Sequence, residues 1–230
     1  MLHNRRKRKI LSQFPKVMSP HPLSAAPPTR PPAGGDTARR RIVAGARRYF
    51  FSHGFRGVTM DDLAAELGMS KKTLYAHFPS KMALLQAVMC DKMNAVEADL
   101  ERVTTESGAD FPARLQAMLA CMRGHTEEIS EPYVRDVRRE APELFAQVQE
   151  RRRAIIQRFF GKLIRDGRKV GRIRKDIPEN MMIEVLLGAV DSVVNPAKMG
   201  ELCSTPKEAF YQIITIFLEG VMIKERKGKS

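Results

Sequence analysis

Two short helical patterns joined by a glycine turn constrain the fold of this chain more than any other feature of its sequence. Thr59 is placed to cap one helix, with Asp62 three residues later as its capping-box partner, and Gly68 stops that helix. Ser70 then caps a second helix, which we expect over residues 71–77. Because a helix of that length is not stable alone, the pattern predicts that neighbouring helices hold it in place.

The second short helix has an apolar side and a polar side. Leu74 and Phe78 are the expected anchors against other helices, and the remaining side chains are basic or hydrogen-bonding: Lys71, Lys72, Thr73 and Tyr75. A short helix that docks by its apolar side and presents cationic groups outward has the form of a recognition helix. We therefore predict a helix-turn-helix DNA-binding domain over residues 37–84.

The segments before this pair form a helix and a tail. Ile42, Ala46 and Phe50 recur at helical spacing and predict a helix from Thr37 that ends at Gly54. Residues 1–36 are rich in proline and basic residues, which predicts a disordered tail. Its run of basic residues (5–9) is either an arm on DNA, a solvated tail, or the product of a start assigned too early.

The charge of the chain is concentrated near its N-terminus. The net charge is +14, which indicates a polyanionic partner. Residues 37–90 carry nine basic residues against three acids, whereas residues 91–230 carry twenty-four against twenty-two. The three cysteines are isolated, which favours a reducing, cytoplasmic setting without disulfides. No stretch is long and apolar enough to span a bilayer, so we expect no membrane association.

The rest of the chain, residues 85–230, predicts a helical effector-binding and dimerisation domain. Helical patterns run over about 81–105, 111–128, 132–140, 142–165, 178–194 and 206–224, with Gly167 and Gly171 marking a loop. The predicted fold class is all-α, with about nine helices. The last two helices are apolar nearly all round, which predicts either a dimer interface or a deep core within one chain. The residues expected at the interface are Leu186, Val190, Val193, Ile213, Phe217 and Val221.

The N-terminal domain resembles that of the TetR family of transcriptional regulators. The similarity rests on an ordered set of residues between about 40 and 85: Gly54-Phe55, Val58-Thr59-Met60, Asp62-Leu63-Ala64, Leu67-Gly68-Met69-Ser70, Leu74-Tyr75, His77-Phe78, Lys81 and Leu84-Leu85. The resemblance implies a homodimer, a double-stranded palindromic operator and a small-molecule effector. It also implies that the protein is a repressor, since most such proteins repress and a minority activate.

The same resemblance implies which residues contact DNA. Thr59, Tyr75, His77 and Lys81 match positions that hold the DNA backbone, and Lys71, Lys72 and Thr73 match positions that face base edges. Ser70 and Thr59 also open helices whose free N–H groups accept phosphate, and no acid follows Lys81 in its first turn. The alternatives are that Tyr75 and His77 pack within the domain, and that Lys72 adds a phosphate contact instead of reading guanine.

An effector pocket is the least defined feature. Its candidates lie at helical spacing or among nearby aromatics: Met118, Cys121, Met122, His125, Phe145 and Phe159. They suit an apolar or aromatic effector, although such residues are more often core. His125 has no partner at ligand spacing, so no metal or cofactor is expected, and Arg151–Arg153 is expected to be a solvated helix face. Motifs typical of enzymes are missing, which leaves a non-specific DNA-coating protein as the main alternative.

Overall fold

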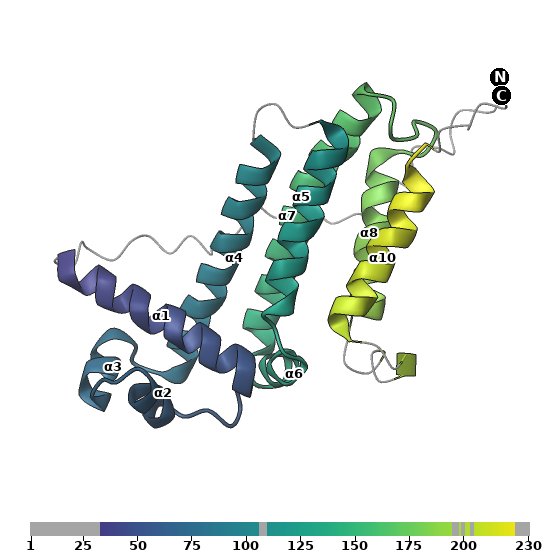
Figure 1. Cartoon of the computed structure of the whole chain (residues 1–230). Helices are drawn as coiled ribbons and strands as arrows, with labels where there is room; N and C mark the ends of the chain where they lie inside the picture. Colours follow the sequence, from purple (N-terminus) through teal and green to yellow (C-terminus); the bar gives the residue numbers. More distant parts are fainter. Residues whose placement is uncertain (1–32, 106–109, 195–197, 199–200, 203–204, 224–230) are drawn as a thin grey trace, which may run out of the picture.

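The computed structural model describes residues 33–105, 110–194 and 205–223, together with residues 198, 201 and 202. These residues are almost entirely helical, as Figure 1 shows. The helices are α1 (Ala33–His53), α2 (Met60–Glu66), α3 (Lys71–His77), α4 (Lys81–Thr105), α5 (Phe111–Glu127), α6 (Glu131–Glu140), α7 (Pro142–Lys169), α8 (Glu179–Val193) and α10 (Pro206–Val221). The predicted all-α class is confirmed. The basic run at residues 5–9 lies outside the described residues.

The first three helices form a small domain around one apolar cluster. Ile42 and Phe50 of α1, Leu63 of α2 and Leu74 of α3 are each completely buried in that cluster. α1 begins at Ala33, four residues earlier than predicted, and so includes Gly34 and Gly35. Once a helix has formed, each further residue adds a hydrogen bond, and this outweighs the cost of two glycines in its first turn.

The remaining helices form a second, larger domain. α4 leaves the N-terminal domain and runs beside α5 and α7, while α8 and α10 lie next to each other on the far side of α7 from α4 (Figure 1). α5, α7, α8 and α10 contribute most of the second apolar cluster. α1 also packs against α6, so the two domains share a boundary. No helix among the described residues is long and apolar enough to cross a membrane.

α7 is longer than the sequence predicts because Gly167 does not end it. A Cβ atom on Gly167 would lie 2.7 Å from both Ile173 Cδ1 and Phe111 Cε2. Glycine therefore allows Phe111 at the start of α5, and Ile173 in the loop after α7, to lie close to α7. Gly171, with a φ of +69°, is the residue that turns the chain after the helix.

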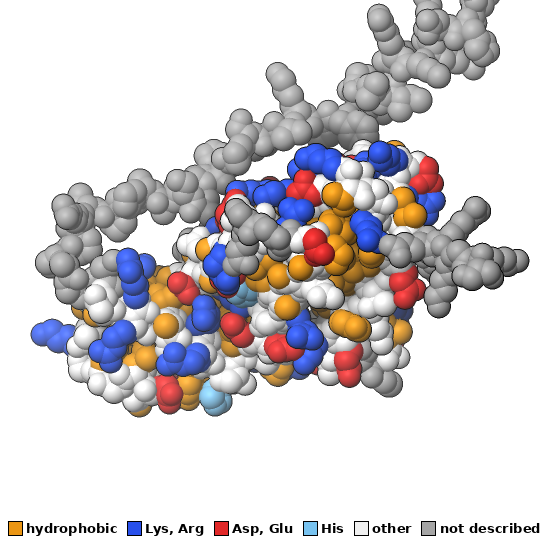
Figure 2. All heavy atoms as spheres, turned by 45° about the horizontal axis from the view of Figure 1, so that its top comes forward, with side chains coloured by type: hydrophobic (Ala, Val, Ile, Leu, Met, Phe, Trp, Pro, Cys, Tyr) orange, Lys and Arg blue, Asp and Glu red, His pale blue; other side chains and the backbone are white. Residues whose placement is uncertain are grey.

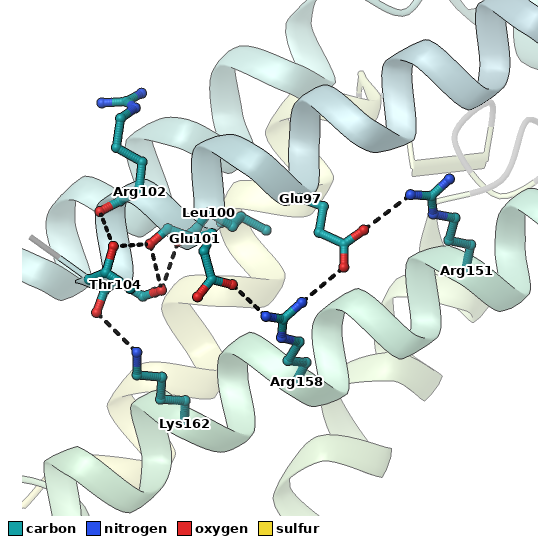
Figure 3. A network of polar contacts seen from close by, with 9 residues as sticks. Glu97, Leu100, Glu101, Arg102, Thr104, Arg151, Arg158 and Lys162 are labelled. Carbon is teal, nitrogen blue, oxygen red and sulfur yellow. Dashed lines mark hydrogen bonds and ion pairs between the residues drawn. The ribbon is translucent and has the colours of Figure 1, made fainter. Parts of the chain in front are cut away.

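Ion pairs join α7 to its neighbours, which corrects the prediction that Arg151–Arg153 is a solvated face. Arg151 and Arg158 both bind Glu97 of α4, at 3.1 and 3.0 Å, and Arg158 also binds Glu101 at 2.5 Å (Figure 3). Lys162 donates to the backbone carbonyl of Thr104 near the end of α4. Arg152 and Arg153 instead bind Asp191 of α8, and Arg153 also binds Glu184. These partners are remote in the sequence and meet only because the helices pack side by side.

Candidate nucleic-acid interface

α3 is held against the domain by its apolar side. Leu74 is 0% exposed and Phe78, its C-cap, is 1% exposed, and both lie in the N-terminal apolar cluster. The guanidinium of Arg39 lies 4.7 Å from the centre of the Phe78 ring and adds a cation–π contact. The predicted anchors are therefore confirmed. The opposite side of α3 faces solvent.

Both predicted N-caps are confirmed. The Thr59 hydroxyl accepts from the amide of Asp62 at 3.1 Å, and the Asp62 carboxylate accepts from the Thr59 amide at 2.8 Å. These hydrogen bonds to Thr59 hold the pKa of Asp62 below its usual value. The Ser70 hydroxyl accepts from the amide of Thr73 at 3.1 Å. The caps fix where α2 and α3 begin and so set the geometry of the turn between them.

Most residues predicted to contact DNA are exposed on or beside α3. Lys71, Lys72 and Thr73 are exposed, and Tyr75 is 47% exposed, which disfavours the alternative that Tyr75 packs within the domain. His77 is only partly buried. These placements are compatible with contacts to DNA, and the contacts themselves stay predictions.

Lys71 is already paired across the turn. Its ammonium lies 2.5 Å from the carboxylate of Asp61 on α2, and both side chains are more than half exposed. An ion pair this exposed contributes little to stability and is readily exchanged for another partner. Lys71 can therefore exchange Asp61 for another anionic partner, and its predicted contact with DNA stays a prediction.

Lys81 has a structural role that the sequence does not reveal. Its ammonium donates to the carbonyls of Phe55 at 2.7 Å, Arg56 at 3.3 Å and Val58 at 2.6 Å. It also lies 4.2 Å from the centre of the Phe55 ring. Burial lowers the pKa of Lys81, while nearby carboxylates oppose that shift. The predicted phosphate contact stays a prediction, but this ammonium points into the α1–α2 loop.

Asp136 of α6 holds the other side of the same loop. Its carboxylate accepts from the amides of Phe55 at 3.1 Å and Arg56 at 2.9 Å. Gly54, with a φ of +83°, allows this approach, since a Cβ atom there would lie 2.9 Å from Asp136 Oδ2. The C-terminal domain therefore contacts the segment that leads into α2. The sequence contains no local signal for this contact, because 80 residues separate its partners.

The residues predicted for the dimer interface lie mainly in the chain's own core, so this prediction is wrong. Leu186, Val190, Ile213, Phe217 and Val221 are buried in the C-terminal apolar cluster, and Val193 packs against it partly buried. Each helix has two apolar faces, and these six residues occupy the inward one. The outward face instead carries exposed apolar side chains: Met181 and Val185 on α8, and Tyr211 and Ile216 on α10.

The six candidates for an effector pocket do not form one pocket. Phe145 packs against the N-terminal cluster, whereas Met118 and Phe159 are buried in the C-terminal cluster, with Cys121 and Met122 partly buried beside it. His125 lies in a polar group between α4 and α5. A groove of about 480 Å³ opens elsewhere, and its lining is Gln157, Glu179, Asn180, Ile183 and Glu184 of α7 and α8. None of the six candidates lines that groove.

Basic side chains are distributed over the N-terminal domain. Figure 2 shows Lys and Arg side chains in blue across this domain, while apolar side chains in orange gather over the C-terminal helices. A capped pair of short helices, the second of them exposed and cationic, defines the chain as a helix-turn-helix DNA-binding protein.

Comparison with known proteins assigns the family. Residues 42–88 match the family model of bacterial regulatory proteins, tetR family. The transcriptional activator FasR of Mycolicibacterium smegmatis is 27% identical over 59% of this chain and 67% of its own length. The transcriptional repressor AcnR of Corynebacterium diphtheriae is 25% identical over 70% of this chain and 82% of its own length.

Solved structures share the fold. A transcriptional regulator from Cytophaga hutchinsonii superimposes with a TM-score of 0.63 and 19% identity, over 82% of this chain and all of that one. A TetR-family regulator from Agrobacterium tumefaciens gives a TM-score of 0.62 at 16% identity, over the same share of each chain. This chain belongs to the TetR family of transcriptional regulators.

Proposed function

We propose that the protein is a homodimeric, ligand-responsive regulator that binds a palindromic operator with α3 in the major groove. The observation that carries this proposal is that one side of α3 is buried in the domain while the other side is exposed. Leu74 and Phe78 anchor the helix, while Lys71, Lys72 and Thr73 remain available to base edges and phosphates.

The outward face of α8 and α10 supports a homodimer. Val185 is 58% exposed and Ile216 is 72% exposed, and the two helices pack side by side. An apolar face of this kind on neighbouring helices is typical of an interaction surface. Two copies joined there would carry two recognition helices, as paired half-sites require.

Responsiveness to a ligand is the finer part of the proposal. α4 begins directly after α3 and packs against α1, α5 and α7, so a shift of α4 in the C-terminal domain would displace the DNA-binding domain. We propose that an effector bound in the C-terminal domain causes this shift and releases the operator. We also propose repression, the role in the name of AcnR, although FasR is named an activator. A reporter gene under the bound promoter distinguishes the two.

DNA footprinting on genomic fragments, beginning upstream of the protein's own gene, tests the proposal. We expect a palindromic site bound about a thousandfold or more tighter than random duplex. Lys72→Glu should abolish this binding, whereas Lys169→Glu, at the end of α7, changes the charge equally and should not. Lys72→Ala separates two roles: uniform weakening with a salt slope lower by about one indicates a phosphate contact, and relaxed specificity at one position indicates a base contact.

The net charge of +14 supports a second candidate, a protein that coats DNA without sequence preference. That candidate predicts equal affinity for every duplex and a steep dependence on salt. Equal affinity for genomic and random fragments would contradict the operator-binding proposal.

A further inference from the structure

A polar group lies between α4 and α5, where two packed helices ordinarily bury apolar side chains. Lys92 is almost completely buried, and its ammonium lies 2.8 Å from a carboxylate oxygen of Glu128 and 3.0 Å from Nδ1 of His125. Nε2 of His125 lies 3.1 Å from Oδ2 of Asp99. His125, which has no partner in the sequence pattern, thus has two partners contributed by α4.

Cys121 completes a set of three metal-ligating side chains. Cys121 and His125 are four residues apart on α5 and so lie on the same face of that helix, opposite Asp99 on α4. The sulfur, nitrogen and oxygen ligand atoms all lie within 4.8 Å of one another. Zinc bond lengths place neighbouring ligands of a tetrahedral site about 3.3–3.6 Å apart. Binding one ion therefore requires the three side chains to move their ligand atoms closer together.

We propose that Asp99, Cys121 and His125 bind a divalent transition-metal ion of the zinc class. A ligand set of thiolate, imidazole and carboxylate suits such ions, whereas Mg²⁺ and Ca²⁺ prefer oxygen ligands alone. Three protein ligands leave a fourth position for water or a small ligand. The thiol of Cys121 releases its proton to solvent when the ion binds, since the thiolate is the ligand.

The surroundings of the three ligands fit this ion. The Asp99 side chain is 42% exposed, which gives an entry route, while that of His125 is only 15% exposed. Arg102 binds Oδ1 of Asp99 at 3.1 Å and leaves Oδ2 to the metal. The ion pair with Glu128 offsets the positive charge of Lys92 and so reduces its repulsion of a bound cation. Supporting contacts of this kind orient the ligands of a metal site.

Metal binding at this site has a structural consequence for Lys92. An ammonium has no acceptor, so Nδ1 of His125 accepts from Lys92, and Nε2 carries the proton that faces Asp99. A metal bound to Nε2 displaces that proton, and the neutral imidazole then carries its proton on Nδ1. The Nδ1–H group and the Lys92 ammonium are both hydrogen-bond donors, so they can no longer bind each other. Lys92 must then leave His125.

The displacement of Lys92 would occur directly beneath the DNA-binding domain. The Lys92 ammonium lies 6.0 Å from the centre of the Phe51 ring, and Phe51 is buried on α1. Metal binding would therefore change the contact between α1 and α4. This regulatory step rests on the proposed function, whereas the metal site itself does not.

Titration of the metal-free full chain with Co²⁺ tests the site. We expect one ion per chain, with visible absorption of tetrahedral cobalt and a thiolate-to-cobalt charge-transfer band. The Cys90→Ser/Cys203→Ser variant, in which Cys121 is the only thiol, should keep the band, and Cys121→Ser should lose it. Absence of the band from both the natural chain and the double variant, or its persistence in Cys121→Ser, would overturn the proposal.

The regulatory step is tested by adding Zn²⁺ to the complex with a footprinted DNA fragment. We expect the affinity to change by about 5–150-fold, the usual range of allosteric coupling, and the change to vanish in Cys121→Ser. Specific DNA binding without a cobalt band would refute the metal site alone. A cobalt band without any specific DNA site would refute the proposed function alone. A band with unchanged DNA affinity would overturn the regulatory step.

Discussion

Replacing Asp136 by alanine should loosen the α1–α2 loop and the start of α2. The side chain is only 14% exposed and accepts two backbone hydrogen bonds, from Phe55 and Arg56. The amide of Phe55 is part-buried, so losing its hydrogen bond to Asp136 should cost about 1.5–3 kcal/mol in the free energy of unfolding. The more exposed amide of Arg56 can bind water instead. We expect a total loss of about 2–3 kcal/mol.

Two further variants separate charge from geometry. Asp136→Asn keeps an acceptor oxygen and loses the charge, so it should cost less than Asp136→Ala. Gly54→Ala should cost about 1–2 kcal/mol, because the alanine must adopt a positive φ and its Cβ approaches Asp136. Asp91→Ala serves as the control, since its ion pair with Arg47 lies on the surface and contributes at most about 1 kcal/mol.

Urea unfolding followed by circular dichroism measures these free energies, and hydrogen exchange locates them. A loss of about 2 kcal/mol should accelerate exchange of the Phe55 and Arg56 amides about thirtyfold if they exchange by local opening. If Asp136→Ala is no less stable than Asp91→Ala and both amides keep their protection, the contact does not stabilise the loop. The reasoning about its role would then be refuted.

Three other changes test the anchoring of α3, the cap of α2 and the outward face of α10. Leu74→Ala should cost about 2–5 kcal/mol in thermal unfolding, and an unchanged Tm would contradict its role as an anchor. Since the pKa of Asp62 lies below 3.8 in the folded chain, its carboxylate stabilises the fold above that pH, and the stabilisation disappears as the pH falls. Asp62→Asn should therefore be less stable than the natural chain at pH 7, and acid unfolding should show the difference shrinking below pH 3.8. Ile216→Glu should give monomers in analytical ultracentrifugation, whereas Val170→Glu, an equally apolar exposed site on another element, should leave dimers intact.

The helix-turn-helix could be predicted from the sequence because its signals are local. The caps of α2 and α3 link residues three apart, and the apolar positions that hold α3 recur at helical spacing. Such patterns depend on neighbouring residues and on backbone geometry alone. The predicted bounds of α3 and α4 accordingly coincide with the observed ones.

The candidate sites in the C-terminal domain were predicted less well. The two apolar faces of α8 and of α10 look equivalent in the sequence, so the pattern could not show which face lies in the chain's own core. The partners of Lys81 and of His125 lie more than twenty residues away, so no spacing rule identifies them.

The sequence by itself determined an all-helical chain with a capped, cationic recognition helix, because helix propensity, capping and amphipathic period act over a few residues. Only the tertiary structure decided which side chains face inward, that Lys81 and Asp136 hold the α1–α2 loop, and that Asp99 meets Cys121 and His125. Those contacts depend on the register and crossing of whole helices, which results from packing of the entire core.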